Sequence, residues 1–235
     1  MIVLRSLVFV VLFYLWSALM VVVLAPVMLG PRRWTLAAMH VWARGFMALL
    51  EPICGIEVVV RGREHLPAGA AFVAAKHQCM LDALGTVAFF DDACFVTKQE
   101  LFAIPFFGWW SRRAGMIAVD RGGRSAALRK MVSDARARMS EARQLIIFPE
   151  GHRMAPGETG DYQPGVAALY RELGLPCTPL ATNSGLHWPA HGFIRRPGRI
   201  VYEFLEPIPA GLHRSAFMRT LQERIETASR RLLAE

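Results

Sequence analysis

The segment SLVFVVLFYLWSALMVVVLAPVMLG, from Ser6 to Gly30, contains no charged residue. At about 1.5 Å per residue, a helix of this length can cross the roughly 30 Å hydrocarbon core of a bilayer. A cleaved signal peptide is the alternative interpretation, but the run is longer than an ordinary signal-peptide core and no clear A-x-A cleavage site follows it. The sequence therefore predicts a retained membrane helix, which Pro26 is expected to bend near its end.

The next segment, WTLAAMHVWARGFMALLEPICG (34–55), is apolar on most sides and predicts a second helix that lies in the interface or folds back as a hairpin. The sequence leaves open whether these helices span the bilayer or insert into it from one side only. Arg5 precedes the first apolar run, whereas three arginines follow it: Arg32, Arg33 and Arg44. This bias places the rest of the chain in the cytoplasm. The expected organisation is a membrane helix pair over residues 1–54 and one domain over 55–235.

Composition narrows the partners of the chain. Its 235 residues are 54% hydrophobic and carry a formal net charge of +8, which suits an anionic lipid surface or phosphate-bearing substrates. Nucleic acid is the other partner class, but the sequence has no RNP-like aromatic motif, zinc-finger spacing or long basic run.

The sequence has four cysteines, Cys54, Cys79, Cys94 and Cys177. They are far apart and form no CxxC motif, so neither a metal site nor a disulfide framework is indicated. Unpaired cysteines fit a reducing compartment.

Beyond Gly55, short β-branched runs alternate with helical patterns. The runs that predict strands are IEVVV (56–60), AAFVAA (70–75), ACFVT (93–97), MIAV (116–119), QLIIF (144–148), CTPLAT (177–182) and RIVYEFL (199–205). Apolar residues at helical spacing predict helices within 124–143 and 217–232. The alternation predicts an α/β fold with a mixed, mostly parallel sheet flanked by helices.

Polar residues follow three of these strands directly. His77 follows the 70–75 strand, Asp120 and Arg121 follow MIAV, and PEGHR (149–153) follows QLIIF. Each cluster alone is compatible with ordinary turn chemistry. Together they mark the carboxyl-terminal edge of the sheet, where open α/β sheets bind ligands.

Four ordered blocks carry a resemblance to a known family. HQCMLD (77–82), GMIAVDR (115–121), FPEGHR (148–153) and CTPLA (177–181) resemble the glycerolipid acyltransferase family, in particular its bacterial members that acylate 1-acylglycerol 3-phosphate. TKQEL (97–101) resembles a further lysine-containing block. The chain departs from the family pattern at two positions: Lys76 stands where the family usually has Asn, and His152 where it usually has Thr.

The resemblance implies transfer of an acyl group from a thioester to a glycerol hydroxyl. His77 is then the general base, and Asp82 fixes its tautomer and stabilises the imidazolium. Glu150 is assigned to orienting the acceptor hydroxyl, and Gly151 lets the backbone approach the substrate closely. The implied ligands of the acceptor phosphate are three cationic side chains: Arg153 first, supported by Arg121 and Lys98.

The same resemblance implies membrane lipids and lysophosphatidic acid as partners, and acyl-CoA or acyl carrier protein as the acyl donor. No metal or tightly bound cofactor is expected, and the catalytic domain is expected to face the cytoplasm from the inner membrane. The stretch LFAIPFFGWW (101–110) is expected to line an acyl-chain tunnel or to dip into the bilayer.

Three alternatives stay open at this point. The first is an acyltransferase of the same family whose acceptor is another lyso-lipid, such as a lyso-ornithine lipid. The second is a membrane scaffold without catalysis, and the third is a serine or cysteine hydrolase. A scaffold without catalysis has no physical need to keep His77, Asp82 and Glu150 together, so their joint presence argues against that alternative. A hydrolase needs an activated nucleophile, and the sequence has no GxSxG motif. Cys79 is the nearest thiol to the histidine, and a structural role is expected for it.

Overall fold

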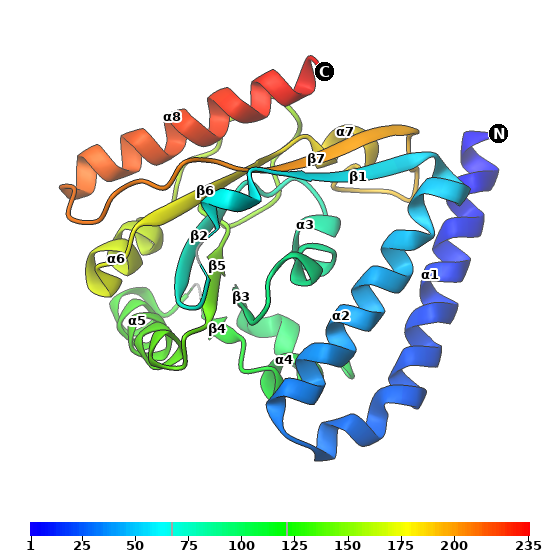
Figure 1. The fold of residues 1–235 in the computed structure, drawn as a ribbon, viewed down its shortest axis with the longest axis horizontal. Helices are drawn as coiled ribbons and strands as arrows, with labels where there is room; N and C mark the ends of the chain where they lie inside the picture. The colour runs from blue at the N-terminus through cyan, green and yellow to red at the C-terminus, as the bar shows by residue number, and fades with distance from the viewer. Residues whose placement is uncertain (67, 121) are drawn as a thin grey trace.

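The computed structural model describes residues 1–66, 68–120 and 122–235. Within these residues, seven strands form one sheet in the order β1-β7-β6-β2-β5-β3-β4 (Figure 1). They are β1 (Ile56–Arg61), β2 (Ala71–Ala75), β3 (Ala93–Lys98), β4 (Ile117–Val119), β5 (Gln144–Ile147), β6 (Cys177–Thr182) and β7 (Gly198–Phe204). Only β6 and β7 pair antiparallel, which confirms the expected mixed, mostly parallel sheet.

Helices cover both faces of this sheet. They are α1 (Ile2–Leu24), α2 (Arg32–Ala48), α3 (Leu81–Leu84), α4 (Phe107–Arg113), α5 (Arg124–Ser140), α6 (Pro164–Leu173), α7 (Ser184–His187) and α8 (Arg214–Leu233). Side chains of β2 alternate between the two layers: Val73 packs in the cluster that contains α1 and α2, and Phe72 packs in the cluster of α5, α6 and α8. The sheet is therefore the middle of three layers.

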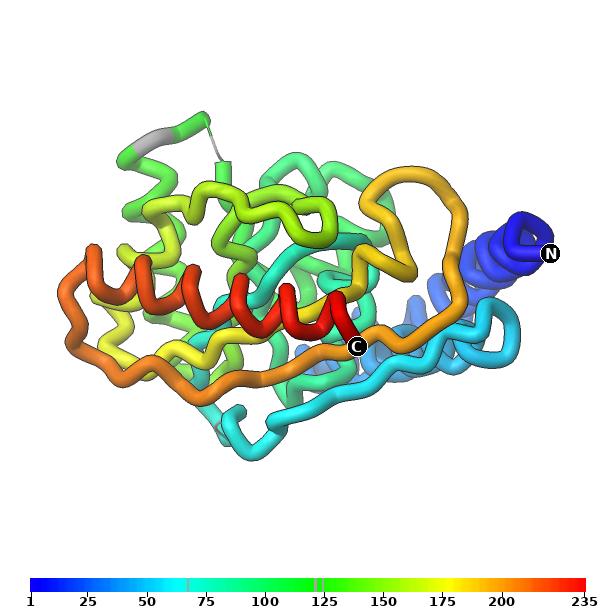
Figure 2. Tube along the Cα trace, turned by 90° about the horizontal axis from the view of Figure 1, so that it is seen from above, coloured from blue at the N-terminus to red at the C-terminus, as the bar shows by residue number. Residues whose placement is uncertain are grey.

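The N-terminal helices form a hairpin at one end of the molecule, with α5 and α6 at the other end (Figure 2). Helix α1 ends at Leu24 and a 3-10 turn over Ala25–Leu29 follows, where Pro26 was expected to bend the chain. The two helices are locked by indole hydrogen bonds: Trp16 Nε1 donates to the carbonyl of Trp42 at 2.9 Å, and Trp42 Nε1 donates to Ser17 Oγ at 3.0 Å. The second apolar segment therefore folds back as a hairpin, one of the two arrangements expected for it.

Gly45 allows this close approach. A β-carbon at this position would lie 2.1 Å from Trp16 Cζ2. Glycine to alanine inside a helix ordinarily stabilises by about 0.5–1 kcal/mol, but overpacking against the ring costs about 1–3 kcal/mol. A Gly45→Ala variant is therefore expected to melt below wild type in a detergent-solubilised thermal scan. A variant that melts at or above wild type would contradict this packing.

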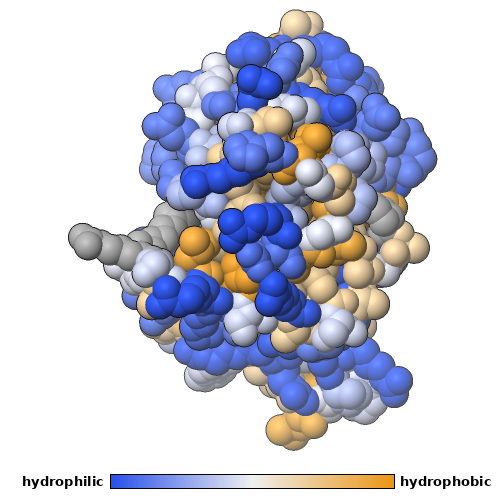
Figure 3. All heavy atoms as spheres, turned by 90° about the vertical axis from the view of Figure 1, so that its left-hand side faces the viewer, coloured by the Kyte–Doolittle hydropathy of each residue, from blue (hydrophilic) through white to orange (hydrophobic). Residues whose placement is uncertain are grey.

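Among the described residues, one helical stretch is long and apolar enough to cross a membrane: α1 with the 3-10 turn that follows it, Ile2–Leu29. Only 11% of its most apolar 18 residues are buried. Its buried side chains are Ser6, Phe9 and Phe13, which face the protein. The exposed large apolar side chains of α1 include Leu4, Leu7, Val11, Leu15, Leu19 and Val22. The opposite end of the molecule is mainly hydrophilic (Figure 3). The apolar surface of α1 therefore has the character of a lipid-facing surface.

A second exposed apolar patch lies beside the tip of the hairpin. Arg113 at the end of α4 donates hydrogen bonds to the carbonyls of Met28, at 2.9 Å, and Gly30. The patch consists of Leu101, Ile104, Phe106 and Trp109. Because these side chains are exposed beside the hairpin, contact with the bilayer explains them better than the lining of an enclosed tunnel.

Arg143 connects the starts of β3 and β4, which lie at the edge of the sheet opposite β1. Its side chain is fully buried, and its Nε donates to Asp92 Oδ1 at 2.8 Å. Its remaining hydrogen bonds, each 2.9 Å long, go to the carbonyl oxygens of Gly115, Ala93 and Ala114. Burial opposes the ionisation of Asp92, but hydrogen bonds and charges from Arg32 and Arg143 outweigh it and lower the pKa of Asp92.

Candidate active site

His77 lies just beyond the carboxyl end of β2. The strand ends with the Lys76 amide donating to the carbonyl of Leu180 at 2.8 Å, and the chain then turns into α3. Asp82 is in the first turn of α3, so the four-residue spacing brings its Oδ2 back to 3.2 Å from His77 Nδ1. The imidazole stacks on Phe148, with ring centroids 4.1 Å apart. Since Nδ1 contacts Asp82, Nε2 is the nitrogen left to meet a substrate.

The carboxylate of Asp82 is fully buried and held by five further donors, one of which is the thiol of Cys79, whose Sγ lies 3.5 Å from Oδ1. The amides of Gln78 and Cys79 donate to Oδ2 at 2.6 and 2.7 Å. The hydroxyls of Ser184 and Tyr202 donate to Oδ1 at 2.6 and 2.8 Å. Burial opposes its ionisation, but the hydrogen bonds and charge from His77 and the hydrogen bond from Ser184 outweigh burial and lower the pKa of Asp82. Asp82 is therefore a fixed anion that can orient His77 and stabilise its protonated form.

Cys79 is the thiol closest to this pair in sequence. Its side chain is buried, and burial, reinforced by the charge of Asp82, raises its pKa well above the ordinary value. A buried thiol held in its protonated form is a poor nucleophile. The structure therefore agrees with a structural role for Cys79.

The FPEGHR segment (148–153) forms a loop beside the histidine. Gly151 adopts a φ of 73°, which favours glycine, and its amide donates to the carbonyl of Phe148 at 3.0 Å. The amide of Met154 donates to the carbonyl of His77 at 2.8 Å and ties the two loops together. Arg153 is exposed, and its Nη1 donates to the carbonyl of Ala190 at 2.8 Å. Its guanidinium therefore lies on the surface of the loop that is tied to His77.

Glu150 points inward from the same loop. It is fully buried, and its Oε1 lies 3.1 Å from the Nζ of Lys76. Burial raises the pKa of Glu150 to about 7, although the nearby charge of Lys76 opposes this rise. The carboxyl predicted to orient the acceptor hydroxyl thus faces a buried lysine in this structure.

The remaining predicted phosphate ligands are less closely placed. Lys98 ends β3, is largely exposed, and has its Nζ 3.4 Å from Glu100 Oε1. It lies at the same edge of the sheet as His77, since β2 and β3 both run parallel to β5. Arg121 lies outside the described residues. The structure therefore brings His77, Asp82 and the FPEGHR loop together, and it shows no contact between Lys98 and them in the described residues.

Three residues of this site were not found by sequence reasoning: Ser184 and Tyr202, which bind Asp82, and Glu226, whose Oε1 lies 2.7 Å from Lys76 Nζ. Ser184 directly follows Asn183 and the CTPLAT strand, and polar residues after a strand are the signal that identified the other clusters. Tyr202 and Glu226 occupy positions within a regular strand and helix, where a single sequence gives no such signal.

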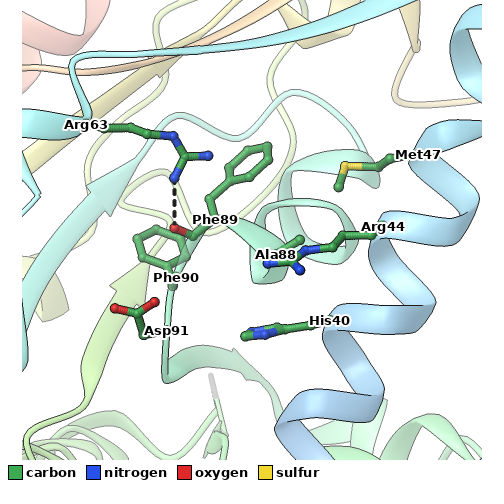
Figure 4. Close-up of a pocket in the computed structure, with 8 residues that line it drawn as sticks. All are labelled: His40, Arg44, Met47, Arg63, Ala88, Phe89, Phe90 and Asp91. Atoms are coloured by element: carbon green, nitrogen blue, oxygen red, sulfur yellow. Dashed lines mark hydrogen bonds between the residues drawn. The ribbon is translucent and has the colours of Figure 1, made fainter.

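A separate cleft of about 580 Å³ opens between α2 and the segment leading into β3. His40 and Arg44 reach into it from α2, and Arg63 reaches in from the opposite wall (Figure 4). Asp91 and Phe90 precede β3, whereas His77 follows β2, so the cleft lies at the other edge of the sheet from the histidine. None of the predicted site residues lines it.

Comparison with known proteins concerns the family of the chain. A family model described as Acyltransferase matches residues 57–183. The 1-acyl-sn-glycerol-3-phosphate acyltransferase of Pseudomonas aeruginosa is 34% identical over 159 residues, which cover 68% of this chain and 62% of that protein. The Saccharomyces cerevisiae protein of the same name is 29% identical over 176 residues, covering 73% of this chain and 58% of that protein. The chain thus spans less than two thirds of these relatives.

The fold has a counterpart among solved structures. The crystal structure of the 1-acyl-sn-glycerophosphate (LPA) acyltransferase from Thermotoga maritima superposes with a TM-score of 0.83 at 22% identity, covering 100% of this chain and 99% of that one. This likeness concerns the fold, including the N-terminal hairpin. The family model, in turn, spans every residue predicted for the site, from His77 to Arg153, and more than half of the sequence. The chain therefore belongs to the acyltransferase family.

Proposed function

We propose that the chain transfers a fatty acyl group from an acyl thioester to the sn-2 hydroxyl of 1-acylglycerol 3-phosphate, which yields phosphatidic acid for phospholipid synthesis. The observation that carries this proposal is His77 held by the buried carboxylate of Asp82 at 3.2 Å, beside the FPEGHR loop. The names of the relatives support the choice of acceptor.

The geometry supports a direct transfer without an acyl-enzyme. His77 Nε2 takes the proton of the acceptor hydroxyl as the oxygen attacks the thioester carbonyl. Asp82 accepts the Nδ1 hydrogen bond and stabilises the imidazolium that forms. The tetrahedral intermediate then collapses, the carbon–sulfur bond breaks, and the thiolate receives the proton from His77. The products are phosphatidic acid and a free thiol.

The test is thiol release by the purified wild-type protein in detergent, with acyl-CoA and acyl carrier protein as donors in turn. Release that requires lysophosphatidic acid and yields phosphatidic acid supports the proposal. A protein that releases thiol only with a different lyso-lipid, such as a lyso-ornithine lipid, keeps the chemistry and replaces the acceptor. Thiol release with no acceptor at all would contradict acyl transfer.

The acceptor phosphate is proposed to bind Arg153, with Lys98 and Arg121 as further cationic ligands. A charged hydrogen bond contributes about 1.5–3 kcal/mol, so an Arg153→Ala variant is expected to lose about 10- to 100-fold in kcat/KM with lysophosphatidic acid. Arg230→Ala removes an exposed arginine of helix α8, outside every proposed binding segment, and is expected to retain activity. Full activity of Arg153→Ala with the phosphate acceptor would contradict the assignment and favour an acceptor without a phosphate.

The proposed location is the inner membrane, with the catalytic domain facing the cytoplasm. The apolar surface of α1 supports membrane association, and the arginines that follow the apolar run support the orientation. The acyl donor is a co-substrate, acyl-CoA or acyl carrier protein, and the proposed chemistry needs no other cofactor. Basic residues in RGGR (121–124) and IRRPGR (194–199) are expected to meet the phosphates or the acidic surface of either donor.

A further inference from the structure

Lys76 is buried at the meeting point of three elements. Its Nζ lies 2.7 and 2.9 Å from the two carboxylate oxygens of Glu226 in α8, and it donates to the carbonyl of Glu158 at 2.9 Å. The same Nζ is 3.1 Å from Glu150 Oε1 in the FPEGHR loop. One ammonium group therefore connects the strand that carries the histidine, the FPEGHR loop and the C-terminal helix.

The charges in this cluster do not balance if every group is ionised. Lys76 supplies one positive charge, whereas Glu150 and Glu226 supply two negative charges, and all three side chains are at most 5% exposed. Tyr162 is the other titratable group at the cluster, and its hydroxyl lies 3.1 Å from Glu226 Oε1. A buried excess charge is costly, so one of the two carboxyl groups is favoured in its neutral form.

The hydrogen bonds identify which carboxyl this is. Glu226 receives hydrogen bonds from Lys76, Tyr162 and, at 3.4 Å, the hydroxyl of Thr159. Within the described part of the chain, neither oxygen of Glu150 has a hydrogen bond of acceptable geometry. Glu150 is therefore the carboxyl of the pair that lacks donors, and it is the group that gains or loses a proton. Its raised pKa, about 7, agrees with this assignment.

We propose that Lys76 and Glu226 are positioning residues for the acyl transfer, which hold the Glu150 carboxyl under the FPEGHR loop and set the pH at which it becomes charged. This inference rests on the proposed function, because it concerns the loop that carries Gly151 and Arg153. Glu226 belongs to α8, beyond the matched family region, so the C-terminal helix completes the site.

The two partners act on Glu150 with opposite signs, which separates this role from simple packing. Lys76→Met removes the positive charge and makes Glu150 harder to ionise, whereas Glu226→Gln removes a negative charge and makes it easier to ionise. A charge within about 4–6 Å shifts a pKa by roughly 1–3 units. The midpoint pH of Glu150 ionisation is therefore expected to shift by about one unit or more. The shift is upward in Lys76→Met and downward in Glu226→Gln.

The experiment follows Glu150 directly by infrared titration of the full-length protein in detergent. The carboxyl C=O band that is lost in Glu150→Gln reports the neutral form, and its midpoint is compared among wild type, Lys76→Met and Glu226→Gln. Lys76→Arg keeps the charge and is expected to stay near wild type. Glu223→Gln changes an exposed glutamate on the same helix and is the matched control.

The same variants are then assayed for the pH dependence of kcat/KM, whose acid limb is expected to move with the infrared midpoint. Equal midpoints in all variants, or shifts in the same direction, would overturn the inference. If Lys76→Met fails to fold, the downward shift in Glu226→Gln still decides the matter. The infrared titration needs no substrate, so it can disprove the roles of Lys76 and Glu226 even if the protein transfers acyl groups. The activity assay tests the proposed function separately.

Discussion

A His77→Ala variant is expected to lose acyl transfer by a factor of about 10²–10⁴, the usual contribution of a general base. Alanine leaves the acceptor hydroxyl with no group to take its proton, because Asp82 is buried behind the imidazole and already receives hydrogen bonds from Ser184 and Tyr202. Thiol release from an acyl thioester with lysophosphatidic acid measures the loss. The imidazole packs mainly on Phe148, so the variant is expected to fold.

Two variants make this result specific. Asp82→Asn keeps the size of the side chain and removes the charge that stabilises the imidazolium, so a large loss of rate is expected there as well. His191→Ala changes an exposed histidine that belongs to none of the motifs, and it is expected to retain full activity. A folded His77→Ala protein that keeps the wild-type rate would disprove the assignment of the base.

Replacement of Arg143 by methionine is expected to cost about 3–5 kcal/mol of unfolding free energy, because its buried guanidinium donates to three backbone carbonyls and each buried acceptor that loses its donor costs about 1–3 kcal/mol. The change leaves Asp92 with Arg32 as its remaining charged partner, and it removes one donor from each of three backbone carbonyls. Chemical denaturation in detergent, followed by tryptophan fluorescence, measures the loss.

Arg136→Met in the neighbouring helix α5 is the matched control. Arg136 pairs with Glu172, but its side chain is 61% exposed, and exposed ion pairs contribute about 0–1 kcal/mol. The control is therefore expected to stay close to wild type. Equal stability losses in the two variants would show that burial of Arg143 does not determine its contribution.

The strands were predictable because each one is a β-branched or apolar run flanked by polar or turn residues. The prediction of QLIIF, for example, differs from β5 by one residue at its end. Helix α6 was not predicted. It has only ten residues, and a helix this short depends on packing rather than on its own propensity. Its buried residues, which include Val166, Leu169 and Tyr170, become informative only once the facing layer is known.

The site was predictable where its chemistry is local in sequence. His77 and Asp82 are five positions apart, and the short turn between β2 and α3 brings them together. Tyr202 lies 120 positions from Asp82, and Glu226 lies 150 positions from Lys76. Such pairs depend on how the strands are ordered in the sheet, which one sequence does not specify. Lys76 itself was noticed as a departure from the family pattern, but its partner was not.

The attachment of α1 to the rest of the protein bears on how the molecule would meet the proposed lipid substrate. Near its start, Phe9 packs on Trp188, and the amide of Arg195 donates to Ser6 Oγ at 2.8 Å. Past its other end, Arg113 binds the carbonyls of Met28 and Gly30. A helix fastened to one domain near both ends cannot stand upright across a bilayer without drawing that domain into the hydrocarbon. The attachment favours insertion into a single leaflet instead, and under the proposed function a lyso-lipid in that leaflet would reach His77 by lateral diffusion, without leaving the membrane.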